Sequence, residues 1–206
     1  SSKSWSSFCF LSVLTRRRTG HAMLEIRIHG RGGQGAVIAS QILSYAFFLT
    51  GRYAQSFPTF GAERRGAPVA AFVRVSDQPI TLRSQVVSPN HVLVLSAKLA
   101  ETVDVTSGID PQGILLINSD KPPSRYPHLQ ESCRVVTVNV SAIALEFGLG
   151  SKTMPLVNAP ILGAFAKVSG LIDVDSLLQA LPRFIPSNLE GNKKALQKAY
   201  EVAPNL

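Results

Sequence analysis

The sequence predicts an α/β domain of Rossmann-like type, in which a mainly parallel sheet carries helices on both faces. Three observations support this fold class. An apolar segment near residue 26 runs into a glycine-rich turn and then into an apolar helix, as in a strand–turn–helix unit. Later segments such as residues 91–95 are continuous apolar runs, typical of strands buried on both faces. Helical segments alternate with these strands, which favours parallel connections.

Length and composition suit one globular domain. The chain has 206 residues, of which 45% are hydrophobic and 17% are charged, and this is enough to bury a sizeable core. Residues 1–22 are expected to be an N-terminal extension outside the fold. They are rich in Ser and Arg, contain no acid, and carry an arginine triplet after their apolar patch, the reverse of a signal peptide. Two interpretations of residues 1–22 stay open: they are a transit-like peptide, or they are translated sequence upstream of the domain. Residues 23–206 are expected to form the domain.

The first element is a short strand at residues 26–29, followed by a helix from about residue 34 to residue 50. Between them, Gly30, Gly32 and Gly35 have the G-x-G-x-x-G spacing. In this motif the first glycine permits a tight turn, the second lets phosphates approach the backbone, and the third lets the helix pack close to the strand. The N-terminus of the helix then offers free amides to an anion or a polar partner.

Further strands and helices follow in alternation, predicted from apolar runs, helical periodicity and capping residues. Strands are expected at residues 69–75, 79–82, 91–95, 113–118 and 133–138. Helices are expected at residues 97–103, 142–147 (with Ser141 as the N-cap), 160–168, 173–181 and 188–202. The Pro-rich stretch at residues 121–127 predicts a surface loop.

Residues 54–68 form a second unusual segment, expected to be a loop near the end of a strand. It mixes two aromatic residues, two prolines and two glycines with the charged triplet Glu63, Arg64 and Arg65, which Gly66 follows. The acid and an arginine can pair and shape the loop. Alternatively, the arginines recognise a carboxylate, a phosphate or an acidic group of a partner subunit.

Composition excludes several classes of protein. The net charge of +8 owes four basic residues to the acid-free segment 1–22, and the other basic residues are scattered, which argues against nucleic-acid binding. No apolar run is long enough to span a membrane. The two cysteines, Cys9 and Cys133, and the four histidines lack the spacing of a zinc or iron–sulfur site, so no metal ligands are expected in this chain.

A conventional dinucleotide site is one alternative for the glycine turn. Such a site expects an acidic residue about 20 positions further on, whereas residues 51–56 contain no acid, and Arg52 could suit a 2′-phosphate instead. A second alternative is a turn that merely lets helix and strand meet. His29, at the end of the first strand, either contacts a ligand or is a hydrogen-bonded strand-end histidine.

The two motifs together resemble a known family. The sequence Gly-Arg-Gly-Gly-Gln-Gly at residues 30–35, followed by Phe-Pro-Thr-Phe-Gly-Ala-Glu-Arg-Arg-Gly-Ala-Pro at residues 57–68, is similar to the gamma subunit of 2-oxoacid:ferredoxin oxidoreductases and to one domain of single-chain pyruvate:ferredoxin oxidoreductases. The resemblance covers roughly residues 24–201. Two positions depart from it: Ser96 stands where an acid is expected, and Ala199 replaces a glycine of the last helix.

The resemblance implies a cytoplasmic enzyme whose chemistry is shared among subunits. Alpha, beta and ferredoxin-like delta subunits would be the partners and would carry thiamine diphosphate, magnesium and iron–sulfur clusters, with coenzyme A as co-substrate and ferredoxin as electron acceptor. The substrate would be pyruvate or a branched 2-oxoacid. No general acid, base or nucleophile is assigned to this chain. The residues expected to contact the cofactor, the site or a partner are Gly30, Arg31, Gly32, Gly33, Gln34 and Gly35, with Glu63, Arg64, Arg65 and Gly66 on the neighbouring loop. A free-standing nucleotide-binding oxidoreductase and a non-catalytic structural adaptor are the alternatives.

Overall fold

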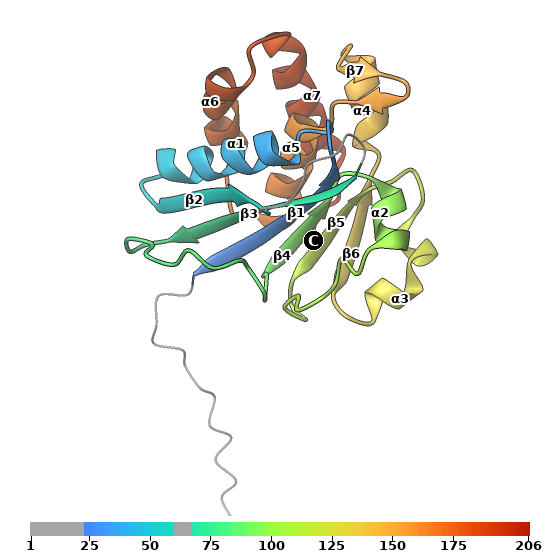
Figure 1. Cartoon of the computed structure of the whole chain (residues 1–206). Helices are drawn as coiled ribbons and strands as arrows, with labels where there is room; N and C mark the ends of the chain where they lie inside the picture. Colours follow the sequence, from blue (N-terminus) through green and yellow to red (C-terminus); the bar gives the residue numbers. More distant parts are fainter. Residues whose placement is uncertain (1–22, 60–66) are drawn as a thin grey trace, which may run out of the picture.

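The computed structural model describes residues 23–59 and 67–206, which form a six-stranded sheet between two layers of helices (Figure 1). The strands of the sheet are β1 (Leu24–Arg31), β2 (Tyr53–Pro58), β3 (Pro68–Ser76), β4 (His91–Val94), β5 (Ile114–Asn118) and β6 (Arg134–Val138), and the strands of a separate hairpin are β7 (Gly150–Ser151) and β8 (Met154–Pro155). The helices are α1 (Ala36–Leu49), α2 (Ala97–Thr102), the 3₁₀-helix η1 (Pro123–Arg125), α3 (Pro127–Gln130), α4 (Val140–Glu146), α5 (Asn158–Ser169), α6 (Val174–Phe184) and α7 (Leu189–Val202).

The order of the strands across the sheet is β2-β3-β1-β4-β5-β6. Strands β1, β4, β5 and β6 are parallel, whereas β3 is antiparallel to both of its neighbours, β1 and β2. The apolar runs of β4 and β5 are buried because helices cover both of their faces. The predicted Rossmann-like α/β fold, with a mainly parallel sheet and helices on both faces, is confirmed.

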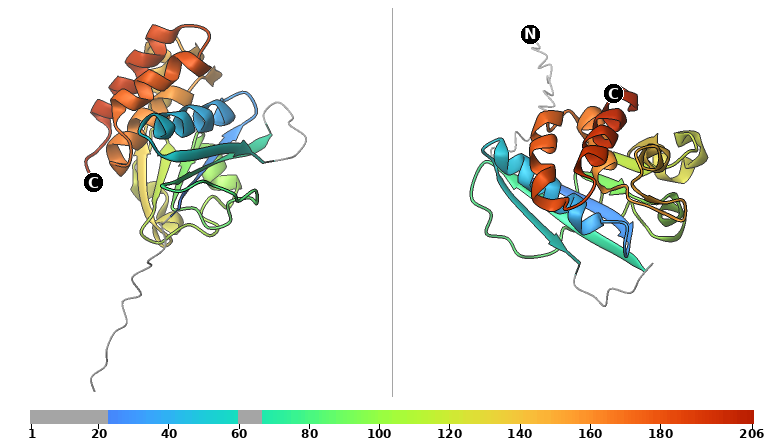
Figure 2. Two further views of the ribbon diagram at one scale, coloured as in Figure 1. Left: turned by 90° about the vertical axis from the view of Figure 1, so that its left-hand side faces the viewer. Right: turned by 90° about the horizontal axis from the view of Figure 1, so that it is seen from above.

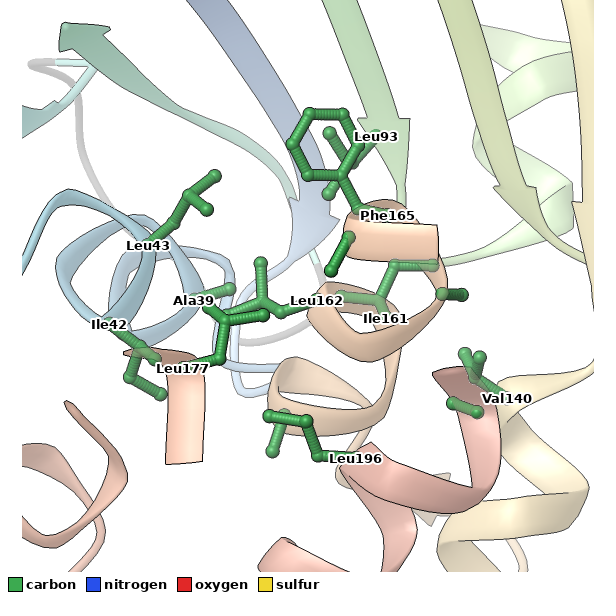
Figure 3. Close-up of a cluster of buried hydrophobic side chains, with 14 of the residues drawn as sticks. Ala39, Ile42, Leu43, Leu93, Val140, Ile161, Leu162, Phe165, Leu177 and Leu196 are labelled. Atoms are coloured by element: carbon green, nitrogen blue, oxygen red, sulfur yellow. The ribbon is translucent and has the colours of Figure 1, made fainter. Parts of the chain in front are cut away.

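The larger apolar core lies between the sheet and the layer formed by α1, α4, α5, α6 and α7 (Figure 2). Helix α5 is at the centre of this layer. Figure 3 shows Leu162 of α5 near Ala39 of α1, and Phe165 of α5 next to Leu93 of the sheet. Leu196 of α7 is also fully buried in this cluster. The packing fixes α1, and with it the glycine turn that precedes this helix.

A smaller core covers the opposite face of the sheet. There Val92 and Leu115 of the sheet pack against Leu99 of α2 and Leu129 of α3. These helices are short and follow β4 and η1 directly, so they cover the β4–β5–β6 half of the sheet (Figure 1).

Two strand predictions are wrong. Residues 54–58 of the expected loop belong to β2, an edge strand whose side chains are mostly half-buried, so it lacks the continuous apolar pattern of a central strand. Residues 79–82 are irregular instead of forming a strand. Pro79 has no N–H to donate, and the edge beside β3 is already occupied by β2.

The helix predictions are largely confirmed. Asp173 caps α6, with its carboxylate accepting from the Ser176 amide at 2.6 Å, and Asn188 caps α7. Helix α4 begins earlier than predicted, because Asn139 rather than Ser141 is the N-cap and accepts from the Ala142 amide at 3.0 Å. The predicted 121–127 loop contains η1 and the start of α3.

Some predictions fall on residues 1–22 or 60–66 and lie outside the described residues. They include the N-terminal extension and the loop residues Glu63, Arg64, Arg65 and Gly66. Among the helices of the described ranges, none combines the length and apolar character needed to cross a membrane.

Candidate functional site

A cleft opens where the parallel strands end. It has a volume of about 390 Å³ and lies between the glycine turn, the start of α2, the residues after β5 and β6, and the β7–β8 hairpin. Ligands of open α/β sheets bind outside the carboxyl ends of the strands, at the point where the strand order reverses. Strand β1 is at this point, because the chain continues from it to β2 and β3 on one side and then to β4, β5 and β6 on the other. The residues lining the cleft include Arg31, Gln34, Ser96, Lys98, Asn118, Ser119, Asp120, Asn139, Ser141 and Thr153.

The glycine turn is closed by its own hydrogen bonds. The Arg31 amide donates to Gln34 Oε1 at 2.9 Å, and the Gln34 amide donates to the Arg31 carbonyl at 2.9 Å. The Gly32 amide donates to the Ala67 carbonyl at 3.0 Å. The amides of Gly33 and Gly35 have no acceptor among the described residues. The turn therefore offers part of its backbone to a ligand, and the Gln34 side chain shapes the turn.

The structural roles of the glycines in this turn differ from those expected from the G-x-G-x-x-G motif. A Cβ on Gly30 would lie 2.9 Å from the Ala36 Cβ, so it is Gly30 that lets α1 pack close to β1. Gly33 and Gly35 have φ angles of +96° and +81°, which favour glycine. A Cβ on Gly35 would also lie 3.1 Å from the Asn158 side chain. The packing role predicted for the third glycine belongs to the first, because β1 continues to Arg31 and passes directly beneath the first turn of α1.

Asn118 holds the floor of the cleft together. Its Nδ2 donates to the Leu95 carbonyl at 2.9 Å and to Ser141 Oγ at 2.8 Å, while its Oδ1 accepts from the Ser141 amide at 3.1 Å. The side chain is nearly buried. It thus links the end of β4, the end of β5 and the start of α4, and these hydrogen bonds fix the spacing of the three segments on this side of the cleft.

Most of the residues that line this cleft are not predicted from the sequence. Arg31 and Gln34 were predicted, and both line it. Lys98 and the polar residues after β5 and β6 were not, and Ser96 was noted only as a departure from the family pattern. One signal was available, since Ser96, Ser119 and Asn139 each follow a parallel strand by one or two positions.

His29 is not among the residues that line the cleft. Alternation along β1 directs its side chain away from α1, toward the face that also carries Arg27. Burial lowers the pKa of His29 to about 4, and Arg27 adds to this effect. The buried Nε2 has no hydrogen-bond partner among the described residues. His29 is therefore a neutral group inside the sheet.

Arg52 cannot serve a 2′-phosphate at the glycine turn. It precedes β2 and pairs with Asp77 at 3.0 Å. The register places the start of β2 opposite Ser76, beside the start of β1. Arg52 thus lies at the opposite end of β1 from the glycine turn, and the geometry argues against a dinucleotide site.

Glu63, Arg64, Arg65 and Gly66 lie outside the described residues. Ala67, which follows Gly66, accepts from the Gly32 amide. Within residues 23–59 and 67–206, no three His, Cys, Asp or Glu side chains come together to form a metal site.

Comparison with known proteins agrees with this geometry. The model of the pyruvate ferredoxin/flavodoxin oxidoreductase family matches residues 25–202. Pyruvate synthase subunit PorC of Methanothermobacter marburgensis is 46% identical over 180 residues, which are 87% of this chain and 97% of that relative. The common gamma subunit of the pyruvate/ketoisovalerate oxidoreductases of Pyrococcus furiosus is 43% identical over 182 residues, covering 87% and 96%.

A solved structure shows the same fold. The crystal structure of the pyruvate oxidoreductase subunit PORC from Thermotoga maritima superposes with a TM-score of 0.69 at 32% sequence identity, covering 87% of this chain and 96% of that one. The two motifs, the cleft beside the glycine turn and these likenesses have one common explanation. The chain belongs to the pyruvate ferredoxin/flavodoxin oxidoreductase family, as a gamma-type subunit.

Proposed function

We propose that this gamma-type subunit holds coenzyme A in the cleft beside the glycine turn and works only within a complex. Its partners would be subunits of the alpha, beta and ferredoxin-like delta types. The complex would oxidatively decarboxylate pyruvate or a branched 2-oxoacid, transfer the acyl group to coenzyme A and pass the electrons to ferredoxin. A cytoplasmic location is part of the proposal, because the free thiol of Cys133 suits a reducing compartment.

The observation that carries the proposal is the chemistry of the cleft wall. The cationic side chains of Arg31 and Lys98 line it, and Asp120 is the single acid among the described residues that do so. The N-terminus of α1, a helix of 14 residues without a side-chain cap, begins at the edge of the glycine turn. Coenzyme A carries several phosphates, and phosphates bind where backbone amides, a helix N-terminus and cations converge.

The proposed contacts comprise the whole turn and the neighbouring loop. They are Gly30, Arg31, Gly32, Gly33, Gln34 and Gly35, with Glu63, Arg64, Arg65 and Gly66. Within this set, Arg31 and the amides of Gly33 and Gly35 are the groups best suited to contact the ligand. Gly30 and Gln34 act by fixing the geometry of the turn.

The described residues do not fit thiamine diphosphate with its magnesium, or an iron–sulfur cluster. They present no clustered carboxylates, histidines or thiols that could bind these metals. We therefore assign these groups to the partner subunits, and no side chain of this chain is given a catalytic role. The chain would bind and orient coenzyme A and exclude water from its thiol.

Steady-state kinetics of the purified complex test the proposal. Arg31→Ala and Lys98→Ala should each raise the KM for coenzyme A by about tenfold, as expected for loss of a charge-assisted contact, and leave kcat nearly unchanged. Lys193→Ala on α7 is the control, since Lys193 pairs with Glu190 and is not among the residues that line the cleft.

Two outcomes would favour other functions. Normal assembly with unchanged KM for coenzyme A in both cleft variants would favour the structural adaptor. Binding of NAD(P)H by the chain in the absence of partners would favour a free-standing nucleotide-binding oxidoreductase.

A further inference from the structure

Within the part of the chain that the structure describes, strand β2 forms one edge of the sheet and pairs with β3 alone (Figure 1). An edge strand presents unpaired backbone groups that can pair with another chain. The hydrogen-bond register identifies these groups. The Thr59 amide donates to the Ala70 carbonyl at 2.8 Å, so residues 53, 55, 57 and 59 face β3.

By the same alternation, the backbone groups of Ala54 and Ser56 point toward the open edge. The pairing of β3 with β1 supports this assignment of the outward-pointing groups. The carbonyls of Glu25 and His29 accept from Asn90 and Leu95 on the β4 side, which leaves the even-numbered residues of β1 to pair with the odd-numbered residues of β3. Among the described residues, no hydrogen bond is made to the outward groups of Ala54 or Ser56.

A groove runs beside this edge on the face of the sheet away from α1. It has a volume of about 480 Å³ and lies between Gln55 and Phe57 of β2 and the irregular segment 80–83. Gln55 Oε1 is buried and has no hydrogen-bond partner among the described residues. Buried polar atoms are rarely left unpaired in proteins, so the described residues leave this face with one polar contact unmade.

The rim of the groove combines apolar and cationic groups. Tyr53 and Leu82 are each 49% exposed. Arg83 lines the groove and forms no ion pair with another described residue, whereas Arg74 nearby is neutralised by Glu25 at 2.7 Å. Exposed apolar groups around an uncompensated cation are typical of an interaction surface for a partner with apolar and acidic side chains.

We propose that β2 and the segment 80–83 form a docking groove for an extended, acidic segment of a partner subunit, which adds to the sheet as a seventh strand. Its backbone pairs with Ala54 and Ser56, alternate side chains enter the groove, and an acidic side chain reaches Arg83. A second copy of this chain is a poorer occupant, because it would bring two Arg83 side chains and two chains of net charge +8 together. The inference rests on the proposed assembly with partner subunits.

Residue-resolved hydrogen exchange of the chain, alone and in the purified complex, tests the backbone pairing. In the isolated chain the Ala54 and Ser56 amides should exchange faster than those of Gln55 and Phe57, which donate to β3. In the complex the Ala54 and Ser56 amides should slow by at least about tenfold, the effect of one added hydrogen bond. Unchanged exchange of both amides in an assembled complex would overturn the inference and leave the proposed function intact.

Two pairs of variants in the full chain test the occupant. Ser56→Pro removes only the outward N–H, as edge strands tolerate, and should weaken incorporation into the complex about tenfold, whereas Ser56→Ala should not. Arg83→Glu should weaken it similarly, whereas Arg83→Lys should not. The circular dichroism of all four should match the wild type, and the assembled variants should keep the wild-type KM for coenzyme A.

Cross-linking from Thr81→Cys in the complex identifies the segment. Cross-links to an extended, acid-bearing segment of a partner subunit support the inference. Cross-links only to another copy of this chain, or only to a basic segment, contradict it. Failure of the wild-type chain to enter any complex would remove both this inference and the proposed function. A wild-type complex whose KM for coenzyme A is insensitive to Arg31→Ala and Lys98→Ala would remove the proposed function alone.

Discussion

Gln34 and Arg31 close the glycine-rich turn on each other. The Gln34 side chain accepts from the Arg31 amide at 2.9 Å, while the Gln34 amide donates back to the Arg31 carbonyl at 2.9 Å. Gln34 thus forms hydrogen bonds with both the amide and the carbonyl group of Arg31. This arrangement holds the turn in a single conformation before any ligand arrives, and preorganisation of this kind lowers the entropy cost of binding.

Two substitutions of Gln34 should distinguish the effect of the shape of the turn from the effect of charge beside the cleft. Gln34→Ala leaves the Arg31 amide without its acceptor, so we expect a loss of about 1 kcal/mol in the free energy of unfolding and a raised KM for coenzyme A. Gln34→Glu keeps an acceptor oxygen but adds negative charge beside the cleft. It should retain wild-type stability and still raise the KM. Thermal denaturation and kinetics of the complex measure both effects, and equal behaviour of the two variants would contradict this account of the turn.

The ion pair of buried Arg74 and half-buried Glu25 should make a large contribution to stability. Arg74 Nε donates to Glu25 Oε1 at 2.7 Å, and the guanidinium also lies 5.1 Å from the centre of the Phe57 ring. Glu25→Gln removes the charge that compensates the buried cation and should lower the free energy of unfolding by about 3 kcal/mol. The control is Glu190→Gln, which breaks the surface pair with Lys193 and should leave stability unchanged within error. Urea denaturation of both variants gives the comparison.

Gly163 permits close contact between α5 and α7. A Cβ at this position would collide with the backbone carbonyl of Leu196, which cannot move without shifting α7. We expect Gly163→Ala to lower the free energy of unfolding by about 3 kcal/mol. Gly191→Ala on α7 is the comparison, because its new Cβ meets only the movable side chain of Asn188, which caps α7 through the Gly191 amide, so the loss should be at most about 1 kcal/mol, that of a cap. An equal loss in the two variants would show that the backbone contact does not matter.

The buried His29 should make the protein less stable in acid. Its pKa is lowered to about 4 in the folded state, from an ordinary value of 6.5, mainly by burial. Between these two pH values the unfolded chain binds a proton that the folded chain does not, so the free energy of unfolding decreases as the pH falls from about 6.5 to about 4. The loss is at most about 3 kcal/mol.

Denaturation at several pH values measures this effect. The slope of stability against pH should be shallower in His29→Gln than in the wild type. It should not vanish, because burial also lowers the pKa of His91. His128→Gln, at an exposed position, should leave the slope as it is. A wild-type slope in His29→Gln would contradict a buried, neutral His29.

Sequence reasoning worked where neighbouring residues decide the outcome. The predicted helix starts at residues 173 and 188 were correct, because the side chains of Asp173 and Asn188 bind amides only three residues ahead. The predicted cap Ser141 was wrong, because Asn139 caps α4. The apolar runs of β4 and β5 were correct, because burial on both faces leaves a continuous pattern. The same reasoning missed β2, whose half-buried side chains give no such pattern.

Prediction of the candidate site was likewise limited to features that depend on residues close together in the sequence. The glycine turn was found because its spacing is local. Lys98 and Asn118 were not found, because they line the cleft only after three strands have been brought side by side. The predicted loop residues 63–66 lie outside the described residues, so their role stays a prediction.

The sequence by itself determined the class of fold, the family and the position of the glycine turn, since each of these depends on contiguous residues or on short spacings along the chain. Tertiary structure alone decided which glycine lies beneath α1, how Gln34 is used and which strand is left at the edge of the sheet. These features follow from contacts between residues far apart in the chain, such as Gly32 with Ala67 and Asn118 with Ser141. Such contacts depend on strand order and register, which no local pattern of residues encodes.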